Sequence, residues 1–124
     1  MAVAVSIALL GALGCLARFY FSGWVYGVAG RTFPYGTLAV NLVGAFCIGF
    51  IMESSTRSDI LPPMLRTGLA VGFLGGLTTF STFSYETFRL LEDGEFWRAA
   101  TNVLVSVLAC LLFTWLGITA AKAL

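Results

Sequence analysis

The sequence predicts an all-α integral membrane protein with four transmembrane helices in a single domain. Hydrophobic residues make up 59% of the chain and charged residues only 10%, whereas soluble domains carry about 25% charged residues. The charged residues also leave long gaps, and a spanning helix needs about 20 apolar residues. These gaps place the four spans at approximately 3–28, 34–53, 64–90 and 96–122.

The first span begins without the basic stretch and cleavage site of a signal peptide, so we interpret it as a transmembrane helix. Its only charged residue is Arg18, and an unpaired arginine in hydrocarbon is costly. Three roles stay open for this side chain. It extends to the interface, it pairs with Glu86 or with a helix C-terminus, or it supplies positive potential to a vestibule.

The second span follows a short loop at 30–33. Pro34 ends this loop and suits the first turn of the next helix. Asn41 lies near the centre of this span, with Thr37 one turn earlier on the same face. Asn41 either joins helices by a hydrogen bond or presents an uncharged amide donor to an anion. A loop rich in turn-forming residues is then expected at 53–63.

The third span contains the most informative stretch, in which Gly75 and Gly76 precede five hydroxyl side chains within 78–84. Adjacent glycines weaken a helix, and irregular backbone at membrane depth survives only when it is buried in protein or lines a watery cavity. This stretch therefore indicates a pathway or an ion site. Phe80 and Phe83 are either core residues or ring edges that contact an anion, because the edge of an aromatic ring is positive.

Small residues predict close helix packing. Gly68, Gly72 and Gly76 recur every four residues, and Gly23 and Gly27 repeat this spacing near a helix end. Four thin helices enclose little volume, so a pathway is easier to build between subunits. We therefore expect an oligomer, most simply a dimer.

The fourth span follows a loop at 92–95 and carries a weakly polar stripe. Asn102, Ser106, Cys110 and Thr114 recur every four residues and so share one helix face. The stripe either packs helices together or forms a polar track for a partly dehydrated ion.

The charged residues give no orientation in the membrane. Both termini and the second loop are expected on one side, and each side carries three basic residues: Arg57, Arg66 and Lys122 on one, Arg31, Arg89 and Arg98 on the other. The positive-inside rule therefore has no bias to act on. Either the chosen boundaries conceal a weak bias, or the chain inserts in both orientations and antiparallel copies pair about a two-fold axis.

Other function classes find little support. The net charge is +1 without a basic cluster, so no nucleic acid partner is expected, and histidine is absent. Cys15, Cys47 and Cys110 lie on different expected helices, in a spacing that suits neither a metal site nor a disulfide framework. We interpret them as small buried apolar residues. The sequence also lacks the triads and phosphate loops of enzymes.

Three elements carry a resemblance to a known family: Gly-Cys-Leu-Ala-Arg-Phe at 14–19, Gly-Thr-Leu-Ala-Val-Asn at 36–41 and Gly-Phe-Leu-Gly-Gly-Leu-Thr-Thr-Phe-Ser-Thr-Phe at 72–83. Over its whole length the chain resembles the small bacterial fluoride channels of the Fluc or CrcB family. The resemblance implies a dual-topology antiparallel homodimer in the bacterial inner membrane, with a break in the third helix. It also implies two pores that let cytoplasmic fluoride escape passively, which counters its toxicity.

The resemblance further implies a structural sodium ion at the dimer centre, held by the backbone carbonyls of Gly75 and Thr78 from each subunit. Hard cations prefer such oxygen ligands, and unwound backbone can supply them. The side chains expected along the fluoride pathway are Asn41, Phe80, Phe83, Ser81, Thr82, Asn102 and Ser106. Asn102 and Cys110 depart from the tyrosine and serine that some relatives carry along the fourth helix.

Two alternatives remain. A small proton-coupled multidrug exporter also has four short helices, but it needs a carboxylate within the membrane. The first span has no Asp or Glu, which leaves Glu86 as a remote candidate. The other alternative is a packing or regulatory subunit without a transport role.

Overall fold

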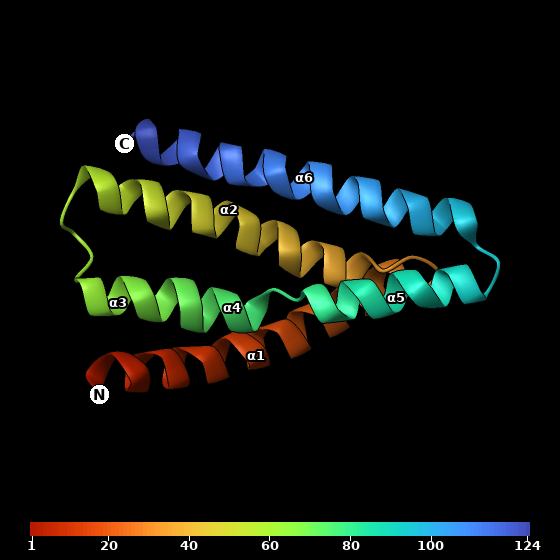
Figure 1. Ribbon diagram of the computed structural model, residues 1–124, viewed down its shortest axis with the longest axis horizontal. Helices are drawn as coiled ribbons and strands as arrows, with labels where there is room; N and C mark the ends of the chain where they lie inside the picture. The colour runs from red at the N-terminus through yellow and green to blue at the C-terminus, as the bar shows by residue number, and fades with distance from the viewer.

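The computed structural model describes residues 1–124 and consists of helices that lie side by side along one long axis (Figure 1). Three helices are long and apolar enough to cross a membrane: α1 (Ala2–Ala29), α2 (Tyr35–Arg57) and α6 (Phe96–Lys122). The stretch between α2 and α6 is divided into α3 (Pro63–Thr67), the π-helix η1 (Gly68–Phe73), α4 (Leu74–Leu77) and α5 (Phe80–Glu92). The fold is therefore all-helical, and several of its helices suit a membrane.

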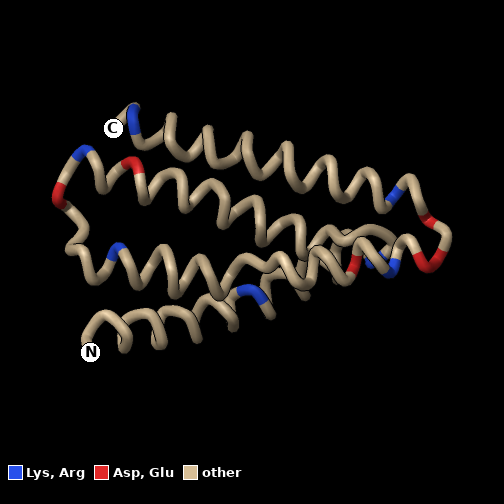
Figure 2. Tube along the Cα trace, in the orientation of Figure 1, with Lys and Arg blue, Asp and Glu red and all other residues tan.

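The chain passes back and forth between two ends of the molecule. Figure 1 shows both termini at one end, beside the connection between α2 and α3. The connections between α1 and α2 and between α5 and α6 lie at the opposite end. Charged residues gather at these two ends (Figure 2). The exception is on α1, whose only charged residue is Arg18. This distribution is what a bilayer requires, because charges at its centre are costly.

Helix α2 continues to Arg57, so the expectation of a loop from residue 53 is wrong. The hydroxyl groups of its last turn bond within the helix. Ser55 Oγ donates to the Ile51 carbonyl at 2.7 Å and Thr56 Oγ1 donates to the Glu53 carbonyl at 2.8 Å. Hydroxyl groups that bond back to the helix in this way need no turn.

The connections between α1 and α2 and between α5 and α6 are short. Pro34 precedes α2 as its N-cap, and not as a residue of the first turn, and its carbonyl accepts a hydrogen bond from the Leu38 N–H at 3.1 Å. Gly30 caps the C-terminus of α1 and Gly94 lies in the connection between α5 and α6, with φ of 86° and 75°. This left-handed region favours glycine because a Cβ is strained there.

The glycine stripe of the third stretch packs against α1. A Cβ on Gly72 would lie 2.7 Å from the Ile7 carbonyl oxygen, and one on Gly76 would lie 2.5 Å from that of Gly11. On the α1 side, a Cβ on Gly14 would lie 2.1 Å from the Phe73 carbonyl oxygen. The stripe thus brings two backbones of the same chain together, as small residues do in membranes.

Helices α2 and α6 form the other close pair. Gly49 and Gly117 leave space for the facing backbone, and a Cβ on Gly117 would lie 2.1 Å from the Phe46 carbonyl oxygen. The buried apolar core is small and centres on Val40, Leu74 and Leu77. Most large apolar side chains are exposed on the outside of the bundle, where lipid is their expected environment.

Candidate ion pathway

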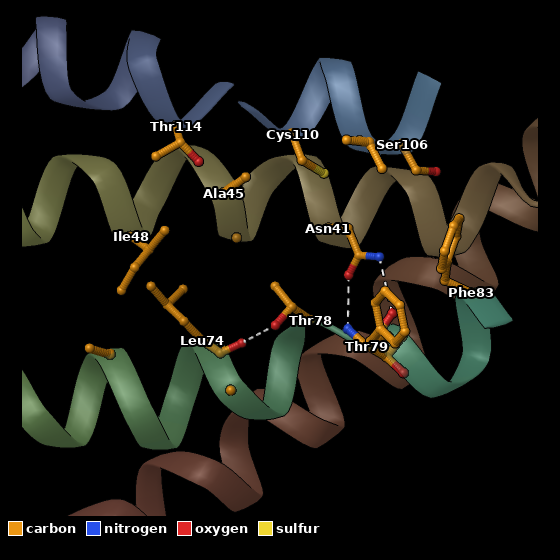
Figure 3. Close-up of a pocket in the computed structure, with 15 residues that line it drawn as sticks. Asn41, Ala45, Ile48, Leu74, Thr78, Thr79, Phe83, Ser106, Cys110 and Thr114 are labelled. Carbon is orange, nitrogen blue, oxygen red and sulfur yellow. Dashed lines mark hydrogen bonds between the residues drawn. The ribbon is translucent and has the colours of Figure 1, made fainter. Parts of the chain in front are cut away.

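An open pocket of about 460 Å³ lies where α2, α4, α5 and α6 meet (Figure 3). Its wall contains amide, hydroxyl, thiol and phenyl groups but no Asp, Glu, Lys or Arg. The residues predicted from the sequence that lie on this wall are Asn41, Gly75, Thr78, Phe80, Phe83 and Ser106. The pocket wall is therefore mostly apolar, with a few uncharged polar groups and no charged side chain.

Thr78 and Thr79 separate α4 from α5 and adopt extended backbone, with ψ of 156° and 120°. Gly75 itself lies within α4. Gly44 on α2 leaves space for this segment, because a Cβ there would lie 2.1 Å from Thr78 Cγ2. The two extended residues thus pass directly against α2 at the pocket wall.

The Asn41 side chain supplies hydrogen-bond partners to the backbone of this extended segment. Its Oδ1 accepts the Thr79 N–H at 2.8 Å, and its Nδ2 donates to the Thr79 carbonyl at 3.1 Å (Figure 3). An amide nitrogen carries two hydrogens, and no second hydrogen bond within the chain uses the other one. Asn41 therefore joins the helices and also retains one N–H donor at the pocket.

The pairing with Asn41 leaves backbone carbonyls without helical donors. A continuous helix would pair the Gly75 carbonyl with the Thr79 N–H, which here points to Asn41. The Thr78 carbonyl loses its donor as well, because the Thr82 N–H bonds to Thr79 Oγ1 at 3.2 Å. Such carbonyls are strong acceptors that need other partners.

The two phenylalanines stand together on α5. Their ring centroids are 5.4 Å apart, with 50° between the ring planes, and both rings line the pocket. Phe80 is 77% exposed, so its ring is not a core side chain within this chain. In Figure 3, Phe83 lies on the same side of the pocket as Asn41 and Ser106.

The polar stripe of α6 divides between two roles. Ser106, Cys110 and Thr114 line the pocket, whereas Asn102 is only 1% exposed and lies behind its wall. Asn102 Nδ2 donates to Thr87 Oγ1 at 2.8 Å, and its Oδ1 accepts from Ser106 Oγ at 3.2 Å. The structure thus uses the Asn102 amide to join α5 to α6.

Ser81 and Thr82 lie on the first turn of α5, off the pocket wall. Their hydroxyl groups surround Thr79 Oγ1, which is 3.3 Å from Ser81 Oγ and 3.0 Å from Thr82 Oγ1. Thr79 caps α5 and lines the pocket, although it was not among the predicted site residues. Threonine is a favoured N-cap residue, so its position directly before α5 is a sequence signal that could have identified Thr79.

Arg18 and Glu86 do not pair with each other. The Arg18 guanidinium donates to the Thr78 carbonyl through Nη1 at 3.4 Å. The two oxygens of the Glu86 carboxylate accept hydrogen bonds from the hydroxyl groups of Tyr26 and Thr37. The alternative of an Arg18–Glu86 ion pair is therefore wrong, and Arg18 lies instead beside the extended segment.

Long apolar helices around a pocket that carries uncharged polar groups define a small multi-pass membrane protein. The family model described as "CrcB-like protein, Camphor Resistance (CrcB)" matches residues 5–118. The chain therefore belongs to the CrcB family, as the resemblance of its motifs indicated.

Similar proteins cover the full chain. The "Fluoride-specific ion channel FluC" of Geotalea uraniireducens (strain Rf4) is 69% identical over 124 residues, which is 100% of both chains. The proteins with the same description from Geotalea daltonii and Geobacter metallireducens are 67% and 69% identical, each over 122 residues and 98% of both chains.

Proposed function

We propose that this chain forms a passive, fluoride-specific ion channel that releases cytoplasmic fluoride and so counters its toxicity. The observation that carries the proposal is the full-length similarity to relatives described as fluoride-specific ion channels. The pocket supports it from the structure, because its wall combines apolar surface with uncharged polar groups and has no charged side chain. The chain is a transport protein and not an enzyme.

The pocket offers partial replacements for the water that fluoride must shed. The free amide hydrogen of Asn41, the hydroxyl group of Thr114 and the edges of two phenyl rings are donors or positive surfaces at the wall. None carries a full charge. An ion is therefore held weakly enough to leave again, which conduction requires.

A second copy completes the pathway in this proposal. The pocket opens at the surface of the chain, so one subunit supplies only part of the wall. A Cβ on Gly75 would meet no atom within 4 Å, in contrast to the closely packed Gly72 and Gly76. An antiparallel homodimer in the bacterial inner membrane accounts for both features, places two pores at the interface and fits the equal number of basic residues on the two sides.

The extended segment fits a structural sodium ion at the dimer interface. The Gly75 carbonyl has no helical donor, and the Thr78 carbonyl accepts only a long hydrogen bond from Arg18. Two such oxygens from each of two subunits match the oxygen ligands that hard cations prefer. The ion would organise the interface and, together with Arg18, add positive potential near the pathway.

The multidrug exporter is disfavoured by the position of Glu86. Such a transporter needs an accessible carboxylate at its substrate site, but Glu86 lies off the pocket wall and is bonded to two hydroxyl groups. A packing subunit without transport is disfavoured by the full-length similarity to relatives described as ion channels.

Purified protein in fluoride-loaded liposomes tests the proposal. With potassium fluoride inside, we expect rapid fluoride release only after valinomycin lets potassium carry the balancing charge, and without any proton gradient. Protein-free liposomes and liposomes loaded with potassium chloride are the controls. Release that requires a proton gradient, or no release at all, contradicts the proposal.

A further inference from the structure

Helix α5 carries both pathway phenylalanines and yet is held weakly by apolar packing. It contains no buried residue. Its main helical neighbour is α6, and it packs only sparsely on α2. Apolar contacts therefore do little to fix its rotation or its position along the bundle axis.

Polar contacts fix α5 instead, at three points. Its N-terminal end is tied to α2 through Asn41 and Thr79. Its last turns are tied to α6 through Thr87 and Asn102. Between these points, Glu86 is tied to both α1 and α2, so one carboxylate connects three helices.

The Tyr26 ring has neighbours that hold it in place. The Arg31 guanidinium lies over its ring, 4.6 Å from the centroid, and a Cβ on Gly36 would lie 2.4 Å from the ring carbon Cε2. The ring thus contacts a cation and lies close to the first residues of α2. Its hydroxyl group donates to Glu86 Oε2, while the Thr37 hydroxyl donates to Oε1.

We propose that Tyr26 is a positioning residue for the ion pathway, acting through Glu86 on α5. A partly buried carboxylate such as that of Glu86 favours the arrangement that supplies its donors. Glu86 lies one turn after Phe83 on the same helix face, so the bonds to Glu86 also fix where the Phe83 ring stands. Tyr26 lies off the pocket wall, so its effect is indirect. This inference rests on the proposed fluoride channel function.

Fluoride release from liposomes tests the role of the hydroxyl group. Tyr26→Phe keeps the ring and removes one hydrogen bond to a charged group, and we expect release about tenfold slower than for the wild type. Tyr20→Phe is the matched control, because Tyr20 is an exposed tyrosine of the same helix whose hydroxyl group makes no hydrogen bond within the chain. It keeps the wild-type rate. Tyr26→Phe together with Glu86→Gln is no slower than Glu86→Gln alone, because Tyr26 acts through Glu86.

A spectroscopic measurement reads the position of Phe83 directly. With 4-fluorophenylalanine at position 83, we expect Tyr26→Phe to shift or broaden the ¹⁹F resonance and Tyr20→Phe to leave it unchanged. Thr37→Val gives the same change through the other carboxylate oxygen, and Thr37→Ser, which keeps a hydroxyl group, restores the wild-type resonance.

The outcomes separate this inference from the function on which it rests. Wild-type protein that releases no fluoride overturns the proposed function, and the ¹⁹F resonance still decides the role of Tyr26. Wild-type protein that releases fluoride, combined with an unchanged rate and resonance in Tyr26→Phe, overturns the positioning role alone. Independent, additive losses from Tyr26→Phe and Glu86→Gln overturn it as well.

Discussion

Asn41 shows how one side chain serves both structure and ion chemistry. Its amide pairs with the N–H and the carbonyl of Thr79, and one N–H donor remains at the pocket. The two alternatives that the sequence left open, a helix-joining hydrogen bond and an anion donor, are therefore compatible in a single residue. The pairing is confirmed by the geometry, while the contact with fluoride stays a prediction.

At the level of the residue, the phenyl rings are the sharpest target. Phe80→Ile and Phe83→Ile keep apolar bulk but remove the positive ring edge, so we expect fluoride release from liposomes to slow about two- to tenfold, with the dimer preserved. Phe88→Ile is the control, because this ring is exposed on the same helix but does not line the pocket. Wild-type rates in both pocket variants would exclude the ring-edge contribution.

Sequence spacing identified side chains but not their partners. It placed Asn102 and Ser106 on one face, yet only the folded chain shows that Thr87 takes up the Asn102 amide behind the wall. Tyr26 carried no signal at all, because its contact with Glu86 joins residues 60 positions apart. Patterns of period 3.6 describe one helix, and contacts between helices depend on their relative position.

At the level of the element, the contact between α1 and the η1–α4 stretch depends on glycine. Gly14→Ala would place a methyl group against the Phe73 carbonyl, and such overpacking costs about 1–3 kcal/mol. We expect the melting midpoint of the detergent-solubilised protein to fall by several degrees. Gly23→Ala is the matched control on α1, since nothing lies within 4 Å of its Cβ. Equal midpoints for the two variants would contradict the packing described here.

Helix boundaries could be predicted from the sequence where turn-forming residues are concentrated. Gly94 and its acidic neighbours predicted the α5–α6 connection. The end of α2 was missed because its serine and threonine hydroxyl groups bond within the helix. The π-helical η1 segment had no signal that distinguishes it from an α-helix, since its glycines and apolar residues suit both.

At the scale of the whole molecule, the proposed antiparallel dimer makes a topological prediction. Because the two sides carry equal numbers of basic residues, we expect the chain to insert in both orientations. A C-terminal tag should then be accessible from both faces of the membrane in protease-protection measurements. A tag confined to one face contradicts dual topology for this chain.

The proposed sodium ion predicts an ion dependence. Replacing sodium thoroughly by N-methylglucamine should weaken the dimer and slow fluoride release, because this organic cation is too large for the carbonyl oxygens of the proposed site to surround it. Restoring sodium should recover both. Unchanged dimerisation and release after the exchange count against a site at Gly75 and Thr78.

Composition alone indicated a helical membrane protein, and the long apolar helices agree. The motif at 72–83 indicated the CrcB family, and the match of the family model to residues 5–118 confirms it. How copies associate depends on contacts between two chains, so the antiparallel dimer stays a proposal.

Bi-ionic recording in a planar bilayer tests the fluoride channel most directly. With fluoride on one side, chloride on the other and a pH difference imposed separately, the uncharged pocket and the channel proposal predict a current carried by fluoride. Its reversal potential should follow the fluoride concentration and ignore the pH difference. A reversal potential that follows chloride or the proton gradient would contradict the proposed function.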